Sequence, residues 1–142
     1  MSEHARDLEE MEREECLVLL RSFTVGRVAI ATASGAVLVV PVNYVVDDEA
    51  IIFRSDPGEK LDHLDDRPAS FQIDFLDPYH RSGWSVLVQG VAYIADPDEV
   101  AHLDMVSWAG GDKAHWVRVV PARITGRRLS PPDLPLDVRG YL

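Results

Sequence analysis

The chain has 142 residues, of which 46% are hydrophobic, so it can form one domain with a substantial core. Its 24 acidic and 14 basic residues give a formal net charge of −10, which repels a nucleic-acid backbone. Cys16 is the single cysteine and excludes an internal disulfide, and no apolar run approaches the roughly 18 residues that a membrane span requires. With no leader-like start, the chain is expected to be cytoplasmic, with neither nucleic acid nor membrane as a partner.

Helical patterns occur at three places along the chain. Residues 6–22 combine helix-forming side chains with an apolar stripe at helical spacing, which predicts an amphipathic helix packed on the rest of the domain. The stripe consists of Cys16, Leu19, Leu20 and Phe23. Two short helices are predicted where an Asp-Pro pair and a following glutamate form a helix start, at Asp56-Pro57-Gly58-Glu59 and at Asp96-Pro97-Asp98-Glu99.

Runs rich in β-branched and aromatic residues predict six strands. They cover residues 25–32, 37–46, 51–55, 70–76, 84–95 and 116–124, with turns at 34–35 and 47–48. Gly90 in the fifth run indicates a bend or bulge, and Pro121 in the last indicates an edge position or a bulge, because proline cannot donate to a ladder. Six strands with short helices at the rims favour a mainly β antiparallel barrel over residues 1–128, followed by a proline-rich tail at 129–142.

A candidate anion site follows the third predicted strand. Arg54 and Ser55 end the strand, and Lys60 lies near the start of the predicted helix. The unpaired N–H groups and the dipole of a helix start attract phosphate. Because Asp56 competes for those N–H groups as a capping carboxylate, we expect Arg54, Ser55 and Lys60 to hold a phosphate from the side. The alternative is that Arg54 and Lys60 are ordinary surface charges.

Two other positions place polar groups in strands that otherwise bury carbon. The amide of Asn43 either binds the edge of a flat ring or is satisfied by neighbouring backbone. Trp84 and Ser85 begin the fifth strand, where the indole either lines a pocket or belongs to the core. The histidines that follow the first helix are too widely spaced to predict a metal site, and no residue is assigned as catalytic.

Three segments, Val40–Tyr44, Ile52–Lys60 and Gly83–Gly90, resemble in order and spacing the pyridoxamine 5′-phosphate oxidase-like family of flavin-binding split barrels. The resemblance covers roughly residues 10–128 and implies a six-stranded split barrel of Greek-key type, forming a homodimer with cofactor sites at the interface. By the family pattern, the first segment lies along the isoalloxazine ring, the second holds the phosphate, and the third reaches the ligand from the second subunit or the neighbouring sheet. The implied cofactor-binding residues are Val42, Asn43, Tyr44, Arg54, Ser55, Lys60, Trp84 and Ser85.

Departures from the family pattern limit the expected activity. A true pyridoxamine phosphate oxidase ends in an Arg-x-His type motif, and residues 136–142 contain no histidine, so pyridoxamine oxidation is not expected. The sequence is more similar to the short branch that includes nitroimidazole-resistance reductases, some of which carry histidine at the position of Arg54. The resemblance implies an FMN-dependent oxidoreductase acting on a small organic acceptor, with the deazaflavin coenzyme F-420 or haem as alternative ligands. A non-catalytic carrier or sensor is the alternative from a different class.

Overall fold

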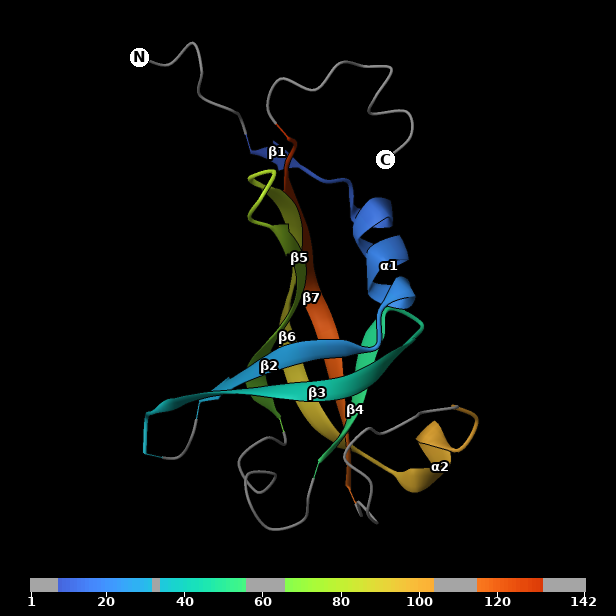
Figure 1. Cartoon of the computed structure of the whole chain (residues 1–142). Coiled ribbons are helices and arrows are strands. Elements are labelled where there is room, and N and C mark those ends of the chain that lie inside the picture. Colours follow the sequence, from blue (N-terminus) through green and yellow to red (C-terminus); the bar gives the residue numbers. More distant parts are fainter. Residues whose placement is uncertain (1–7, 32–33, 56–65, 104–114, 132–142) are drawn as a thin grey trace.

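Strand pairing closes a barrel in the computed structural model, which describes residues 8–31, 34–55, 66–103 and 115–131 (Figure 1). The elements are β1 (Glu9–Glu10), α1 (Arg13–Ser22), β2 (Val25–Ala31), β3 (Val37–Asp47), β4 (Ala50–Ser55), β5 (Arg67–Asp77), β6 (Ser82–Ala95), α2 (Pro97–Val100) and β7 (His115–Leu129). Six antiparallel strands follow the order β7-β4-β3-β2-β5-β6, and β6 pairs with β7 to complete the barrel. The predicted six-stranded antiparallel barrel is therefore confirmed, and β1 is an additional short strand on β7.

The N-terminal helix is shorter than the sequence pattern predicts. Before α1 begins at Arg13, Glu9–Glu10 form β1 and pair with two arginines of β7, so the predicted helix over residues 8–12 is wrong. The N–H of Met11 donates to the carbonyl of Gly126 at 2.9 Å, which holds this segment against β7. Pairing with a distant strand thus overrides the local helix propensity of the acidic run.

The buried side of α1 covers one side of the barrel, with Cys16, Leu17 and Leu20 almost fully buried. The predicted stripe is correct for Cys16 and Leu20, whereas Leu19 is only partly buried and Phe23 is 40% exposed. Burial raises the pKa of the Cys16 thiol, so the thiol stays protonated and unreactive at neutral pH.

The irregular points of the sheet lie where the sequence indicates them. The register between β6 and β7 shifts between Gln89 and Gly90, and Gly90 pairs with Pro121 at this bulge. A Cβ atom on Gly90 would lie 2.0 Å from the carbonyl oxygen of Val120, so only glycine fits there. α2 begins after Asp96, as predicted, whereas the helix expected at 56–59 and the tail beyond residue 131 lie outside the described residues.

Two apolar clusters fix the two sides of the barrel wall. The larger fills the barrel interior beneath α1 and includes Phe53 and Phe71. The smaller lies on the outer side, where α2 and the residues after it cover Ile52 and Trp116. The first four residues of β4 are therefore covered on both sides, which explains the apolar run from Ala50 to Phe53. None of the described helices is long and apolar enough to cross a membrane.

Candidate functional site

A row of three side chains crosses the outer surface of the barrel. Tyr44 of β3 pairs with Phe53 of β4, and both are buried in the barrel interior. Because side chains alternate along a strand, the adjacent Asn43 and Arg54 lie beside each other on the outer surface. Arg54 also pairs with Trp116 of β7, and its guanidinium carbon lies 5.3 Å from the centre of the indole ring. We call Asn43, Arg54 and Trp116 the outer row.

The outer row provides a local positive charge in a chain whose net charge is −10. Arg54 is half-buried, and its contact with the face of Trp116 holds the guanidinium against the barrel wall. Reduced access to water strengthens the attraction between a guanidinium and an anion. The amide of Asn43 offers both donors and acceptors beside that charge. The row therefore has the chemistry to hold an anionic group next to a flat polar ring.

The structure does not bring Ser55 and Lys60, the other residues predicted to hold a phosphate, together with Arg54 among the described residues. Ser55 follows Arg54 in β4, so its side chain lies on the opposite side of the strand from that of Arg54. It is half-buried at the strand end and pairs with His115. Lys60 lies outside the described residues. Joint binding of one phosphate by Arg54, Ser55 and Lys60 stays a prediction.

Val42 and Tyr44 point into the barrel. Val42 packs partly buried against the interior cluster. The Tyr44 ring is 2% exposed and contacts the Phe71 ring edge-on at 4.6 Å. Its hydroxyl donates to the carbonyl of Leu20 at 2.6 Å, and its backbone N–H donates to the carbonyl of Thr24 at 3.0 Å. The Tyr44 side chain therefore holds α1 on the barrel, and the position of residues 42–44 along a ligand ring stays a prediction.

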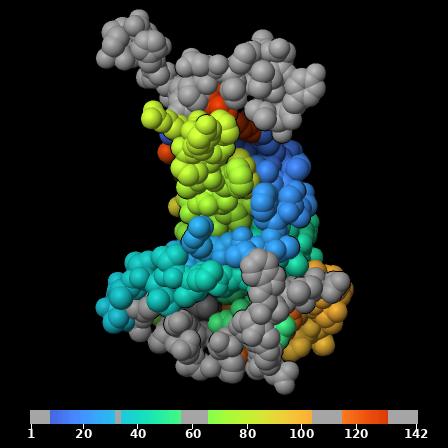
Figure 2. All heavy atoms as spheres, viewed as in Figure 1, coloured from blue at the N-terminus to red at the C-terminus, as the bar shows by residue number. Residues whose placement is uncertain are grey.

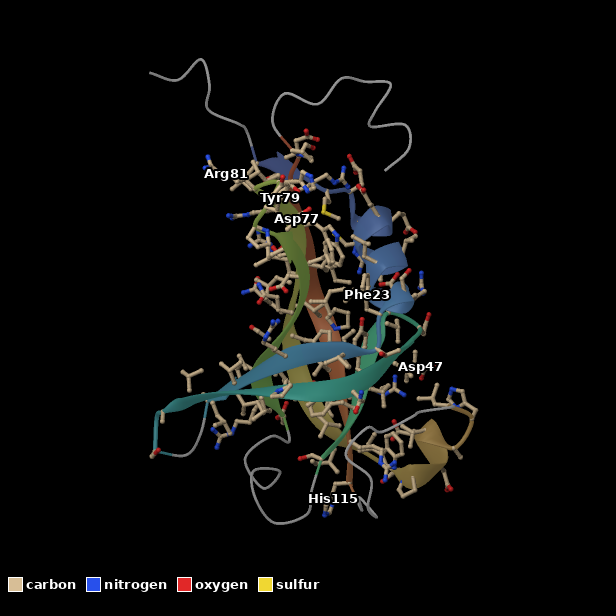
Figure 3. The ribbon with its side chains drawn as sticks, viewed as in Figure 1. Phe23, Asp47, Asp77, Tyr79, Arg81 and His115 are labelled. Carbon is tan, nitrogen blue, oxygen red and sulfur yellow. The ribbon has the colours of Figure 1, made fainter. Side chains whose placement is uncertain are left out.

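Trp84 and Ser85 lie at the other end of the barrel from the outer row. They line an open pocket of about 530 Å³ on β5, β6 and β7, which we call the β5–β6 pocket. Figure 3 shows Asp77 and Arg81 of this pocket at one end of the molecule and His115, which pairs with Ser55, at the other. One chain therefore keeps Trp84 and Ser85 apart from Asn43 and Arg54.

A network of charged groups fixes the barrel wall next to the outer row. Arg118 donates to the carboxylate of Asp47 at 2.9 Å, and its Nε lies 3.7 Å from the carboxylate of Glu99 in α2. The Nε2 atom of His102 lies 3.3 Å from the same Asp47. The Arg118 guanidinium, together with His102, holds the pKa of Asp47 below its ordinary value. These contacts tie α2 and β3 to β7, and so position Trp116 two residues before Arg118.

Two residues that the sequence did not single out belong to these places. Trp116 completes the outer row, and Arg127 pairs with Ser85 and lines the β5–β6 pocket. The signal for both is the register of β7, which pairs with β4 over residues 115–119 and with β6 along nearly all of its length. Across the described residues, no group of three or more histidine, cysteine, aspartate or glutamate side chains could hold a metal ion.

Comparison with known proteins identifies the family. The profile of the pyridoxamine 5′-phosphate oxidase family matches residues 12–128. The uncharacterized protein Rv0080 of Mycobacterium tuberculosis is 32% identical over 134 residues, 88% of each chain. The solved FAD-binding protein of Mycobacterium smegmatis is 32% identical with a TM-score of 0.71, over 84% of this chain and 97% of that chain.

A more distant structure shares the fold alone. This protein of Bacteroides thetaiotaomicron, solved under the provisional name of a 5-nitroimidazole antibiotic resistance protein, is 17% identical with a TM-score of 0.66, over 87% of this chain and 90% of that chain. From the family profile and the 32% identical relatives together, the chain belongs to the pyridoxamine 5′-phosphate oxidase family. The family predicted from the three sequence segments is confirmed.

Proposed function

We propose that two copies of this chain bind a flavin nucleotide between them and pass its electrons to a small organic acceptor. The observation that carries the proposal is the outer row, in which Asn43 and Trp116 lie beside Arg54 of the segment expected to hold a phosphate. The similar protein of Mycobacterium smegmatis binds FAD, which supports a flavin nucleotide here, and the resemblance of the sequence segments favours FMN.

The residues of the outer row fit the two ends of such a ligand. The Arg54 guanidinium suits a phosphate, because charge-assisted hydrogen bonds to phosphate are about twice as strong as neutral ones. The Asn43 amide suits a ring edge on which carbonyl and N–H groups alternate. A bound flavin supplies the two-electron chemistry, while the side chains of this chain bind, orient and stabilise negative charge.

The division of the predicted site between two places supports a homodimer. Ser85 lies in the β5–β6 pocket, at the other end of the barrel from Arg54, so one chain keeps these residues apart. Strands β2 and β3 extend sideways from the barrel (Figure 2) and carry exposed apolar side chains, with Val37 69% and Val39 56% exposed. Apolar side chains grouped on one surface are typical of a protein–protein interface. We infer that a second copy covers this surface and brings its Ser85 to the outer row.

The absorption spectrum of freshly purified protein, with mass spectrometry of the released small molecule, tests the cofactor. Flavin bands with released FMN or FAD are expected. A single band near 420 nm would replace the flavin by a deazaflavin, a Soret band would replace it by haem, and a colourless protein that takes up no flavin would refute the proposal.

A pair of arginine variants tests the outer row. Arg54→Gln is expected to weaken flavin binding by tenfold or more, since one charge-assisted hydrogen bond is worth about 1.5–3 kcal/mol. Arg67→Gln is the matched control, because Arg67 is an exposed arginine at the start of β5. Equal flavin affinity in both variants would remove the assignment of Arg54.

Turnover separates an oxidoreductase from a carrier or sensor. The bound flavin is reduced with dithionite under argon, and its reoxidation is followed after addition of small quinones or nitroaromatic compounds, or of air. Reoxidation by a small acceptor that is faster than reoxidation by air is expected for the proposed enzyme. If no small acceptor exceeds air, the chain is a flavin carrier.

A further inference from the structure

The β5–β6 pocket combines carbon walls with positive charge. Its volume of about 530 Å³ lies in the range of roughly 300–1,000 Å³ that is typical of small-molecule sites. Leu8, Leu76 and Leu129 contribute apolar wall, and Arg81 and Arg127 line the same space. Two guanidinium groups in one pocket are unexpected in a chain with a net charge of −10.

The Arg127 side chain has no hydrogen-bond or ion-pair partner in the described part of the chain. Successive side chains of β7 lie on opposite sides of the strand, so Arg128 pairs with Glu15 of α1 while Arg127 lines the pocket. Glu10 lies opposite Arg127 in the register of β1 and β7. Even so, among the described residues the Arg127 side chain forms neither a hydrogen bond nor an ion pair. Its charge is therefore available to a ligand in the pocket.

The one carboxylate among the described lining residues of the pocket accepts hydrogen bonds from a neighbouring residue. Of the described lining residues, Asp77 alone carries a carboxylate. Asp77 accepts the backbone N–H of His80 at 3.1 Å, and its other oxygen lies 2.5 Å from Nδ1 of the His80 ring. These hydrogen bonds hold the pKa of Asp77 below its ordinary value, so its carboxylate is charged at neutral pH. The described lining thus has two guanidinium groups and one carboxylate, which leaves an excess of positive charge in an apolar pocket.

We propose that the β5–β6 pocket binds the electron acceptor, and that this acceptor is a small organic acid whose apolar body carries a reducible group, such as a quinone or nitroaromatic ring, that takes up the electrons. The body lies against the leucine walls, and the anionic group lies between Arg81 and Arg127. The role as acceptor rests on the proposed flavin function, whereas the binding of an organic anion rests on the pocket alone.

Two fluorescent probes that differ in charge test the class of ligand. The anionic probe is 8-anilinonaphthalene-1-sulfonate, and its uncharged analogue is N-phenyl-1-naphthylamine. Both are titrated into the purified dimer and into the variants Arg81→Gln and Arg127→Gln. Each variant is expected to weaken binding of the anionic probe roughly tenfold and to leave the uncharged probe unaffected. Arg123→Gln is the matched control, because Arg123 is exposed on the same strand but does not line the pocket.

Two results would overturn the proposed ligand class. If the anionic probe binds no more weakly to Arg81→Gln and Arg127→Gln than to Arg123→Gln, the arginines do not select an anion. If neither probe binds, the pocket takes no apolar ligand.

Repeating the titration with flavin bound tests the role as acceptor. Binding of the anionic probe to the flavin-loaded protein is expected. Displacement of the probe by flavin would assign the pocket to the flavin and overturn the acceptor role. Because the first titration needs no flavin, failure of the flavin proposal and failure of the anion proposal are distinguishable.

Discussion

Replacing Tyr44 with phenylalanine tests whether this residue holds the fold or holds a ligand. The Tyr44 hydroxyl is buried and donates to the carbonyl of Leu20 at 2.6 Å, in the last turn of α1. Phenylalanine keeps the edge-on contact with Phe71 and removes only the hydrogen bond, leaving a buried carbonyl without its donor. We therefore expect the free energy of unfolding to fall by about 1–3 kcal/mol.

Chemical denaturation, followed by tryptophan fluorescence, measures this loss as a lower midpoint at an unchanged m value. Burial raises the pKa of Tyr44, so the hydroxyl is protonated and able to donate at neutral pH. Ser22→Ala is the control, because the Ser22 hydroxyl donates to another α1 carbonyl, that of Val18, at an exposed position. It should change stability by less than about 0.5 kcal/mol.

Flavin affinity of folded Tyr44→Phe should match that of the parent protein. A tenfold loss of flavin affinity without a loss of stability would refute the structural role.

Three further substitutions examine the packing and the charges of the barrel. Gly126→Ala should destabilise the protein by about 1–3 kcal/mol, because a Cβ atom there would lie 2.6 Å from the Sγ of Cys16; adding Cys16→Ala should restore part of the loss in denaturant titrations. Gly90→Ala should lower stability at least as much, because the added Cβ atom would clash with the backbone carbonyl of Val120. Shortening a nearby side chain should therefore restore none of the lost stability. Arg118 lowers the pKa of Asp47 from 3.8, so the contribution of Asp47 to the stability of the fold is complete above that value and is lost as pH falls through the lower pKa of the folded state. Asp47→Asn should therefore be less stable than the parent protein at pH 7 and should lose less stability on acidification. If the stabilities of variant and parent fell in parallel with pH, the pairing of Asp47 with Arg118 would be contradicted.

The regular part of the fold follows from local patterns that the sequence displays openly. Gly90 marks the bulge because a long strand rarely contains glycine without a close approach of another backbone. Asp96 marks the start of α2 because it precedes a proline at the first helical position and an acidic first turn, a pattern that is typical of helix starts. The predicted start of α1 is wrong because helix propensity is a local property, whereas the pairing of Glu9–Glu10 with β7 depends on residues more than a hundred positions later.

Only the part of the candidate site that lies on two strands adjacent in sequence could be predicted from the sequence. Asn43 and Arg54 lie on strands joined by a two-residue turn at Asp48-Glu49, so their proximity follows from a local hairpin. Trp116 joins them through the register of β7, which no local pattern specifies. A stricter use of the two-residue period would have placed Tyr44 in the core with Val42 and Val40, because all three share one side of β3.

The separation of Arg54 from Ser85 in one chain makes a direct prediction about a symmetric dimer. In the proposed two-fold dimer each copy gives its outer row to one flavin site and its Ser85 to the other, so two equivalent sites form. A heterodimer of an Arg54→Gln copy with a Ser85→Trp copy then combines both defects in one site and leaves the other intact. We expect it to bind one flavin, measured as the flavin-to-protein ratio of differently tagged, co-purified copies. If each site belonged to a single chain, both sites of the heterodimer would be defective, and the ratio would match that of the two variants alone.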